Sequence, residues 1–150
     1  MSQMSDYLEN KLIDHIFRAT AYTAPATLYV ALLTSAPSDT STGATIAEAA
    51  YTNYARASLA AGVANWKSTN GTTSGASSGT TGQTSNASTL TFGTAPGSGP
   101  TTVTHFAILD SATAGAGNVL FFGSLGASKT INSGDPAPTA VADALTVTLA

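Results

Sequence analysis

The sequence contains little charge and no cysteine. Its 150 residues include five Lys or Arg and eight Asp or Glu, so 9% are charged, whereas an ordinary soluble domain has about 25%. Five of the charged residues lie between positions 6 and 18, and the rest of the chain is rich in Ala, Thr, Ser and Gly. A free protein usually stays soluble through charge. A neutral surface therefore indicates a protein that packs against its own copies or against a large partner.

These absences exclude several functions. Without cysteine the chain has no disulfide framework and no Cys-based metal site. The five basic residues are scattered, whereas nucleic-acid binding relies on clustered Lys and Arg. No run of about 18 apolar residues occurs, so we expect no membrane span. At this length the chain is expected to form one domain over residues 1–150 and to bury a sufficient core without a metal.

Catalytic chemistry is also not indicated. The two histidines, His15 and His105, are far apart in the sequence, and no nucleophile elbow accompanies either of them. Asp110 and Asp135 could offer oxygen ligands to Ca²⁺, but their spacing is unlike an EF-hand and turn formation explains them better. We therefore expect no enzymatic activity, no cofactor and no metal site.

An amphipathic helix is predicted over residues 5–19. Leu8, Leu12 and Ile16 recur at every fourth position, and the pair Ile13 and Phe17 lies beside them, which forms one apolar stripe. Ser5 is the expected N-cap. The polar face is acidic, which argues against binding to an anionic membrane. The stripe is expected to pack on the chain's own sheet or on a neighbouring subunit.

The remainder, residues 27–150, has the pattern of short strands separated by turns. The run 27–34 is apolar throughout, which is typical of a strand buried on both faces. A weaker strand is predicted within 51–59, with Arg56 pointing outward. Further strands are predicted at 89–92, 103–109, 119–122, around 129–131 and at 144–149. The predicted fold class is an all-β antiparallel sandwich, jelly-roll-like or Ig-like, with one N-terminal helix.

Residues 68–89 consist only of Ser, Thr, Gly, Asn, Ala and Gln. Such a segment cannot bury enough apolar surface to offset the entropy of ordering it, so we predict a flexible loop. Trp66, the only tryptophan, directly precedes it. Aromatic residues are favoured anchors of interfaces, although a place in the core explains Trp66 equally well. The candidate interface residues are Tyr7, Leu8, Leu12, Tyr51, Tyr54 and Trp66.

An ordered set of segments carries a family resemblance. The set comprises residues 7–18, 28–34, 54–56, 103–110, 117–125, 129–135 and 145–149. It resembles a family of small virion proteins of tailed bacteriophages, and covers nearly the whole chain apart from 68–89. Members are often labelled tail fibre proteins, and some related small proteins serve as capsid cement or decoration. The resemblance implies a structural protein of the phage particle.

The leading hypothesis is therefore a decoration or cement protein that binds the outer capsid surface and stabilises the shell. Its partners would be the major capsid protein and its own copies, in a homo-oligomer, with no nucleic acid and no membrane. The alternative is a tail or tail-fibre component involved in host attachment, with other tail proteins as partners. A second alternative is a carbohydrate-binding module, which needs Tyr51, Tyr54 and Trp66 to converge on one exposed face.

Overall fold

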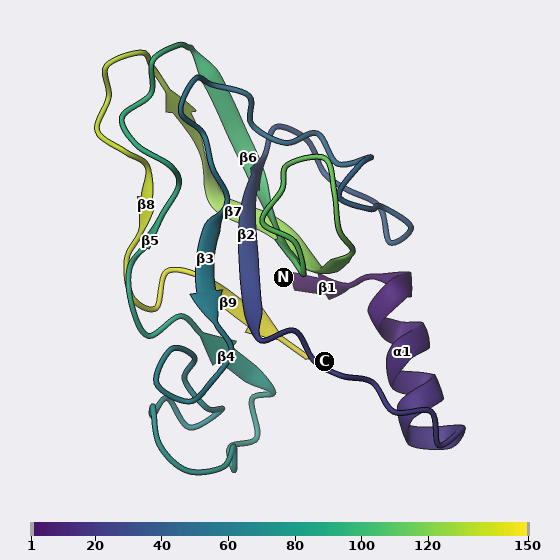
Figure 1. Cartoon of the computed structure of the whole chain (residues 1–150). Coiled ribbons are helices and arrows are strands. Elements are labelled where there is room, and N and C mark those ends of the chain that lie inside the picture. The colour runs from purple at the N-terminus through teal and green to yellow at the C-terminus, as the bar shows by residue number, and fades with distance from the viewer. Residues whose placement is uncertain (1, 150) are drawn as a thin grey trace.

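The computed structural model describes residues 2–149. Over this range the chain forms one α-helix and nine β-strands (Figure 1). The elements in chain order are β1 (Ser2–Met4), α1 (Asp6–Phe17), β2 (Thr27–Leu33), β3 (Ala57–Ala60), β4 (Gln83–Ser85), β5 (Leu90–Thr91), β6 (Thr101–Leu109), β7 (Val119–Ile131), β8 (Thr139–Ala140) and β9 (Thr146–Thr148). A mostly β fold with an antiparallel sheet and one helix near the N-terminus confirms the predicted fold class.

The main layer is a five-stranded antiparallel sheet in the order β1-β7-β6-β2-β3. Its central strands β2 and β6 carry continuous apolar runs, and both faces of the sheet are covered there. Val30 and Leu32 point to one face, and Ala31 and Leu33 to the other, each with its own buried cluster. This burial on both faces confirms the prediction made for the run 27–34.

The second layer is built from two small ladders. Strand β4 pairs with β9, and β5 pairs with β8, each over two or three residues. Leu90, Phe92, Leu145 and Val147 of this layer join the cluster of buried residues on the Val30 face of the main sheet. The main core therefore lies between the five-stranded sheet and the two ladders, as expected of a sandwich.

Helix α1 begins and ends close to the predicted positions. The Ser5 hydroxyl accepts a hydrogen bond from the backbone N–H of Leu8 at 3.3 Å, which confirms Ser5 as the N-cap. The Ser5 side chain is buried, and its hydroxyl also donates to the carbonyl of Val119 in β7. These contacts anchor only the first turn. Figure 1 shows the rest of α1 standing to one side of the sheets.

Other predictions need correction. Strand β3 starts only at Ala57, and Arg56 is buried instead of pointing outward, because its guanidinium finds a carboxylate and two carbonyls inside the fold. The strands predicted at 119–122 and 129–131 form one strand, β7, with a break in register opposite Thr104. The expected loop 68–89 contains β4, because its residues pair with β9 near the other end of the sequence.

Candidate functional site: an apolar face beside the helix

Most of the apolar stripe of α1 is uncovered in this chain. Leu8 is buried at 6% exposure, but Ile13, Ile16 and Phe17 are 50%, 65% and 79% exposed. Large apolar side chains exposed in a group mark a surface of interaction. The helix is held at its capped first turn through Ser5 and packs against β7.

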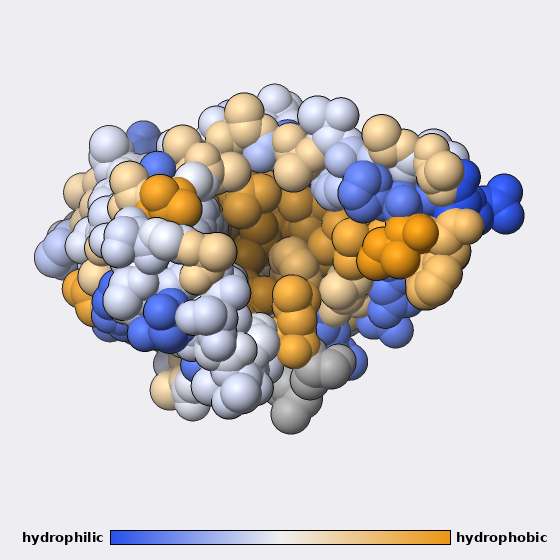
Figure 2. Space-filling view, turned by 90° about the horizontal axis from the view of Figure 1, so that it is seen from below, coloured by the Kyte–Doolittle hydropathy of each residue, from blue (hydrophilic) through white to orange (hydrophobic). Residues whose placement is uncertain are grey.

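A groove of about 470 Å³ opens on the side of the second layer. Its apolar lining comes from β2, β6, β7, the end of β9 and the turn before Trp66, namely Leu28, Ile108, Phe121, Val147, Leu149, Val63 and Trp66. In Figure 2 the hollow is floored by hydrophobic side chains and lies between the Ser/Thr-rich segment and the helix. We call the groove together with Ile13, Ile16 and Phe17 the apolar face.

One wall of the groove is formed by the segment that contains Lys67, and polar contacts join this segment to the C-terminal segment. The Lys67 ammonium contacts the carboxylate of Asp143 at 2.5 Å, and the Ser85 hydroxyl donates to the same carboxylate at 2.7 Å. These hydrogen bonds, that of Lys67 first, hold the pKa of Asp143 below its ordinary value. The Thr84 hydroxyl also donates to the Lys67 carbonyl at 2.7 Å. These hydrogen bonds hold this wall of the groove in place, although its sequence is almost entirely polar.

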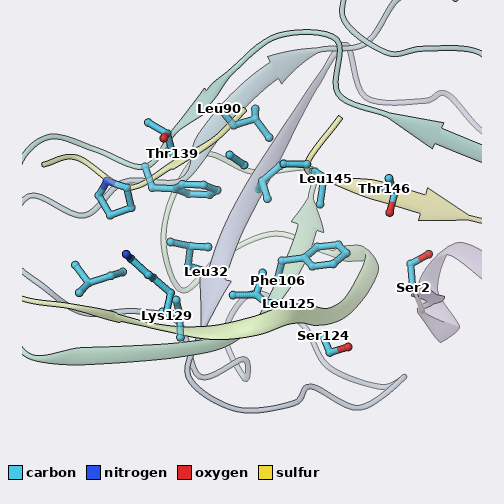
Figure 3. A pocket seen from close by; sticks show the side chains of 18 of the residues that line it. Ser2, Leu32, Leu90, Phe106, Ser124, Leu125, Lys129, Thr139, Leu145 and Thr146 are labelled. Atoms are coloured by element: carbon cyan, nitrogen blue, oxygen red, sulfur yellow. The ribbon is translucent and has the colours of Figure 1, made fainter. Parts of the chain in front are cut away.

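A second hollow of about 470 Å³, the interlayer cavity, lies within the sandwich (Figure 3). Buried core residues such as Leu32, Leu90 and Leu145 line its interior. The space is open to solvent at its rim, where Ser124, Lys129 and Thr146 are exposed.

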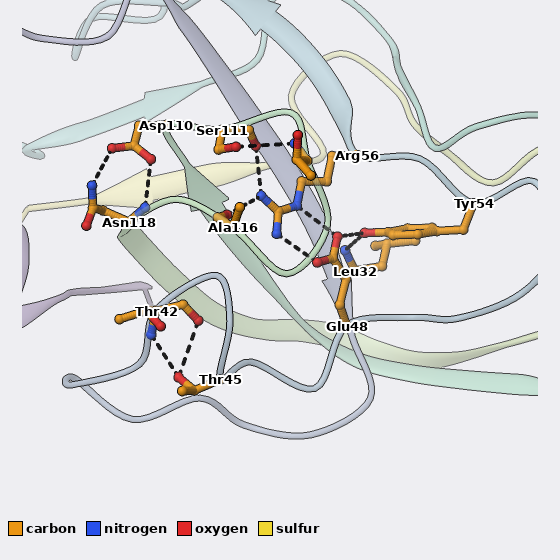
Figure 4. Close-up of polar contacts among 11 residues, drawn as sticks. Leu32, Thr42, Thr45, Glu48, Tyr54, Arg56, Asp110, Ser111, Ala116 and Asn118 are labelled. Carbon is orange, nitrogen blue, oxygen red and sulfur yellow. Dashed lines mark hydrogen bonds and ion pairs between the residues drawn. The ribbon is translucent and has the colours of Figure 1, made fainter.

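The strongest polar cluster is structural. The Arg56 and Glu48 side chains are 0% and 9% exposed, and the guanidinium donates to both carboxylate oxygens at 2.9 and 2.8 Å (Figure 4). The remaining Arg56 nitrogen donates to the carbonyls of Ser111 and Ala116 at 2.8 and 2.9 Å. One side chain thus joins the segment before β3 to the loop between β6 and β7.

Tyr54 completes this cluster. Its hydroxyl donates to Glu48 Oε1 at 2.7 Å and accepts from the backbone N–H of Leu32 at 3.1 Å. Burial, reinforced by the hydrogen bond to Glu48, raises the pKa of Tyr54 well above its ordinary value. The cluster has every ionisable group paired and no open position beside it, so its arrangement is that of a clamp within the fold.

The predicted interface residues are distributed over three environments. Leu8 and Tyr51 are buried in the chain's own packing, and the Tyr51 hydroxyl donates to the Phe92 carbonyl at 2.9 Å. Tyr54 makes an edge-to-face contact with Tyr51, with ring centroids 5.3 Å apart. Leu8 and Tyr51 therefore have little surface to offer a partner, whereas Tyr54 is half-buried.

The other three candidates keep accessible surface. Leu12 is half-buried on the stripe of α1, and Tyr7 is half-buried beneath the Lys11 ammonium. Trp66 lines the groove, and its indole N–H has no acceptor among residues 2–149. Because Tyr51 is buried, the three residues Tyr51, Tyr54 and Trp66 do not form one exposed face. The exposed members of the apolar face that sequence reasoning did not select are Ile13, Ile16, Phe17, Val63 and Leu149.

The histidines take part in local contacts. His15 Nδ1 accepts from the backbone N–H of Tyr22 at 3.2 Å, and His105 Nδ1 lies 2.8 Å from the Thr104 hydroxyl. Within residues 2–149 no group of three or more His, Asp or Glu is arranged to hold a metal ion. Nor does any helix in that range have the length and apolarity to cross a membrane.

A comparison with known protein families identifies one that matches this chain. The model of the family described as Podophage GP4 fiber I protein gp80 matches residues 3–148, which is nearly the whole chain. The matched region includes the helix, every strand from β2 to β9 and all the residues that line the two hollows except Ser2 and Leu149. No curated protein matches the chain.

Proposed function

Because the chain belongs to the Podophage GP4 fiber I protein gp80 family, and is thus a structural protein of the phage virion, we propose that it is a tail-fibre component that assembles through its apolar face. The observation that carries this proposal is the uncovered second half of the α1 stripe beside an open apolar groove. A free monomer would leave this surface in water. A subunit of an assembly would bury it.

A second copy of the chain is the partner that we propose for this face. The apolar helix stripe and the apolar groove flank one another on the side shown in Figure 2. Two copies related by a two-fold axis would each place a stripe in the other's groove, and such isologous contacts are the commonest in soluble oligomers. Near this face the Asp14–Arg18 pair on the helix and the Lys67–Asp143 pair at the groove wall each match one cation with one carboxylate, which limits like-charge repulsion between copies there.

The oligomeric state tests this contact. Sedimentation velocity should show the full chain as a dimer or larger, and Phe17→Ser and Ile16→Ser should shift it toward monomer. Val141→Ser is the matched control, because Val141 is a 61% exposed apolar residue that does not line the groove. A wild-type chain that stays monomeric at high concentration would reject self-assembly through this face. Equal behaviour of the three variants would place the contact elsewhere.

The position in the particle is tested by copy number. We propose the tail, and decoration of the capsid surface is the second candidate, because a nearly neutral surface with few charges suits packing on a shell equally well. Quantitative mass spectrometry of purified virions against the major capsid protein separates the two. A count of roughly a dozen supports the tail, whereas a count on the order of hundreds establishes decoration.

We also propose that the role is structural and not catalytic. The buried ionisable groups are engaged in the Arg56–Glu48–Tyr54 clamp, and the two histidines make only local contacts. A hydrolysis screen of the purified chain against host surface polysaccharides tests this point, and turnover of any of them would overturn it.

A further inference from the structure

The interlayer cavity has polar side chains at both ends and apolar side chains between them. Figure 3 shows Lys129 at one end, Ser2, Ser124 and Thr146 toward the other, and the apolar side chains between them. The interior is formed by side chains of the core, whereas Ser124, Lys129 and Thr146 are exposed at the rim. A cavity of this volume falls in the range of small-molecule sites, roughly 300–1,000 Å³.

Lys129 is distinguished from the other basic residues by its surroundings. It makes no ion pair or side-chain hydrogen bond among residues 2–149, and none of the residues that line the cavity is acidic. Each of the other four has a partner, namely Tyr7 for Lys11, Asp14 for Arg18, Glu48 for Arg56 and Asp143 for Lys67. In a chain with so few charges, this cation without a partner among residues 2–149 lies on the wall of the interlayer cavity.

We propose that the interlayer cavity binds an amphiphile with an unbranched alkyl chain and one anionic head group, of the fatty-acid class. The alkyl chain occupies the space between Leu32, Phe106 and Leu145, where it contacts apolar side chains of the core. The carboxylate pairs with Lys129, with hydroxyl groups such as that of Thr139 near the same end.

This site is distinct from the apolar face. The groove of that face is lined by Leu28, Trp66 and Phe121, none of which lines the cavity. The inference is therefore independent of the proposed assembly. Its failure would leave the fibre role intact, and a monomeric chain would still have the cavity.

Isothermal titration of the full chain with dodecanoate, below its micellar concentration, tests the proposal. We expect saturable binding of one molecule per chain. Lys129→Gln should weaken it about tenfold or more, and Lys129→Arg should keep it, because the interaction needs the positive charge. Dodecyltrimethylammonium, with the same chain and the opposite charge, should bind at least about tenfold more weakly than dodecanoate.

The second part of the experiment fills the cavity with a larger side chain. Ala140→Phe places an aromatic ring on the wall of the cavity, and we expect it to abolish binding. Ala144→Phe fills the same space from an exposed position, and serves if Ala140→Phe does not fold. Ile16→Ser on the apolar face is the control that should leave binding unchanged. Absence of saturable binding overturns the proposal, as does binding that survives cavity filling or ignores the charge at position 129.

Discussion

Removing the negative charge of Glu48 should destabilise the protein more than any other single change of charge. The Arg56 guanidinium is fully buried, and Glu48 is its only carboxylate partner among residues 2–149. Glu48→Gln keeps the shape but leaves a buried cation without its counter-charge. Breaking a buried pair in this way costs about 3–5 kcal/mol. For a domain of this size the melting temperature should fall by roughly 6–20 °C.

Urea denaturation followed by the fluorescence of the single tryptophan measures this loss, because Trp66 packs against the main core. Asp14→Asn is the matched control. It also removes one carboxylate from an ion pair with arginine, but the two side chains are 42% and 70% exposed. An exposed pair of this kind contributes about 0–1 kcal/mol.

Two results would refute this reasoning. One is a Glu48→Gln variant that loses no more stability than Asp14→Asn. The other concerns the double variant Glu48→Met with Arg56→Met, which replaces both charges by apolar side chains and should recover much of the loss. If the double variant is as unstable as the sum of the single changes, the hydrogen bonds of Arg56 to Ser111 and Ala116, and not the pair, hold this region together.

Four further predictions concern stability and its dependence on pH. Tyr54→Phe should cost about 1–3 kcal/mol at neutral pH by leaving buried polar groups unpaired. Because the pKa of Tyr54 is raised in the folded protein, its contribution to stability is present below about pH 10 and lost above it. In urea titrations at increasing alkaline pH, the stability of the variant should therefore fall less steeply than that of the wild type. Ser5→Ala removes the N-cap and should cost about 1–2 kcal/mol by thermal unfolding; no change would show that the cap is dispensable. Asn86→Ala removes three buried hydrogen bonds and should cost on the order of 3 kcal/mol, with increased amide exchange in β9 as the local readout. The pKa of Asp143 is lower in the folded protein than its unfolded value of about 3.9, so the carboxylate stabilises the fold above that pH and this contribution is lost on acidification. The stability of Asp143→Asn should therefore fall less steeply than that of the wild type between about pH 5 and 3.

The sequence predicted correctly those elements whose formation depends mainly on residues that are neighbours in the chain. The helix follows from a four-residue periodicity and a capping serine, and both were visible in the sequence. Strands β2 and β6 follow from continuous apolar runs. The helix stripe was also recognised as a contact surface. Its exposed end was not, because only the structure shows that Leu8 is buried while Phe17 on the same helix stays exposed.

Features that depend on distant partners could not be predicted in this way. Strand β4 is wholly polar, and only its pairing with β9 about 60 residues later makes it a strand. Arg56 was expected in solvent because arginine is usually exposed, but Glu48 and two loop carbonyls satisfy it inside. The groove joins residues from Leu28 to Leu149, so no window of sequence contains it.

Both hollows have a common physical origin in the second layer. Its strands are only two or three residues long, because the segments that separate them are rich in Ser, Thr, Gly and Pro and supply few apolar side chains. The main sheet, with β6 and β7 of nine and thirteen residues, offers more apolar surface than these ladders can cover. Apolar surface that the ladders leave uncovered stays in contact with water unless another molecule covers it. The groove beside α1 and the cavity behind Lys129 both contain such surface, and we propose a second copy of the chain for the first and a small amphiphile for the second.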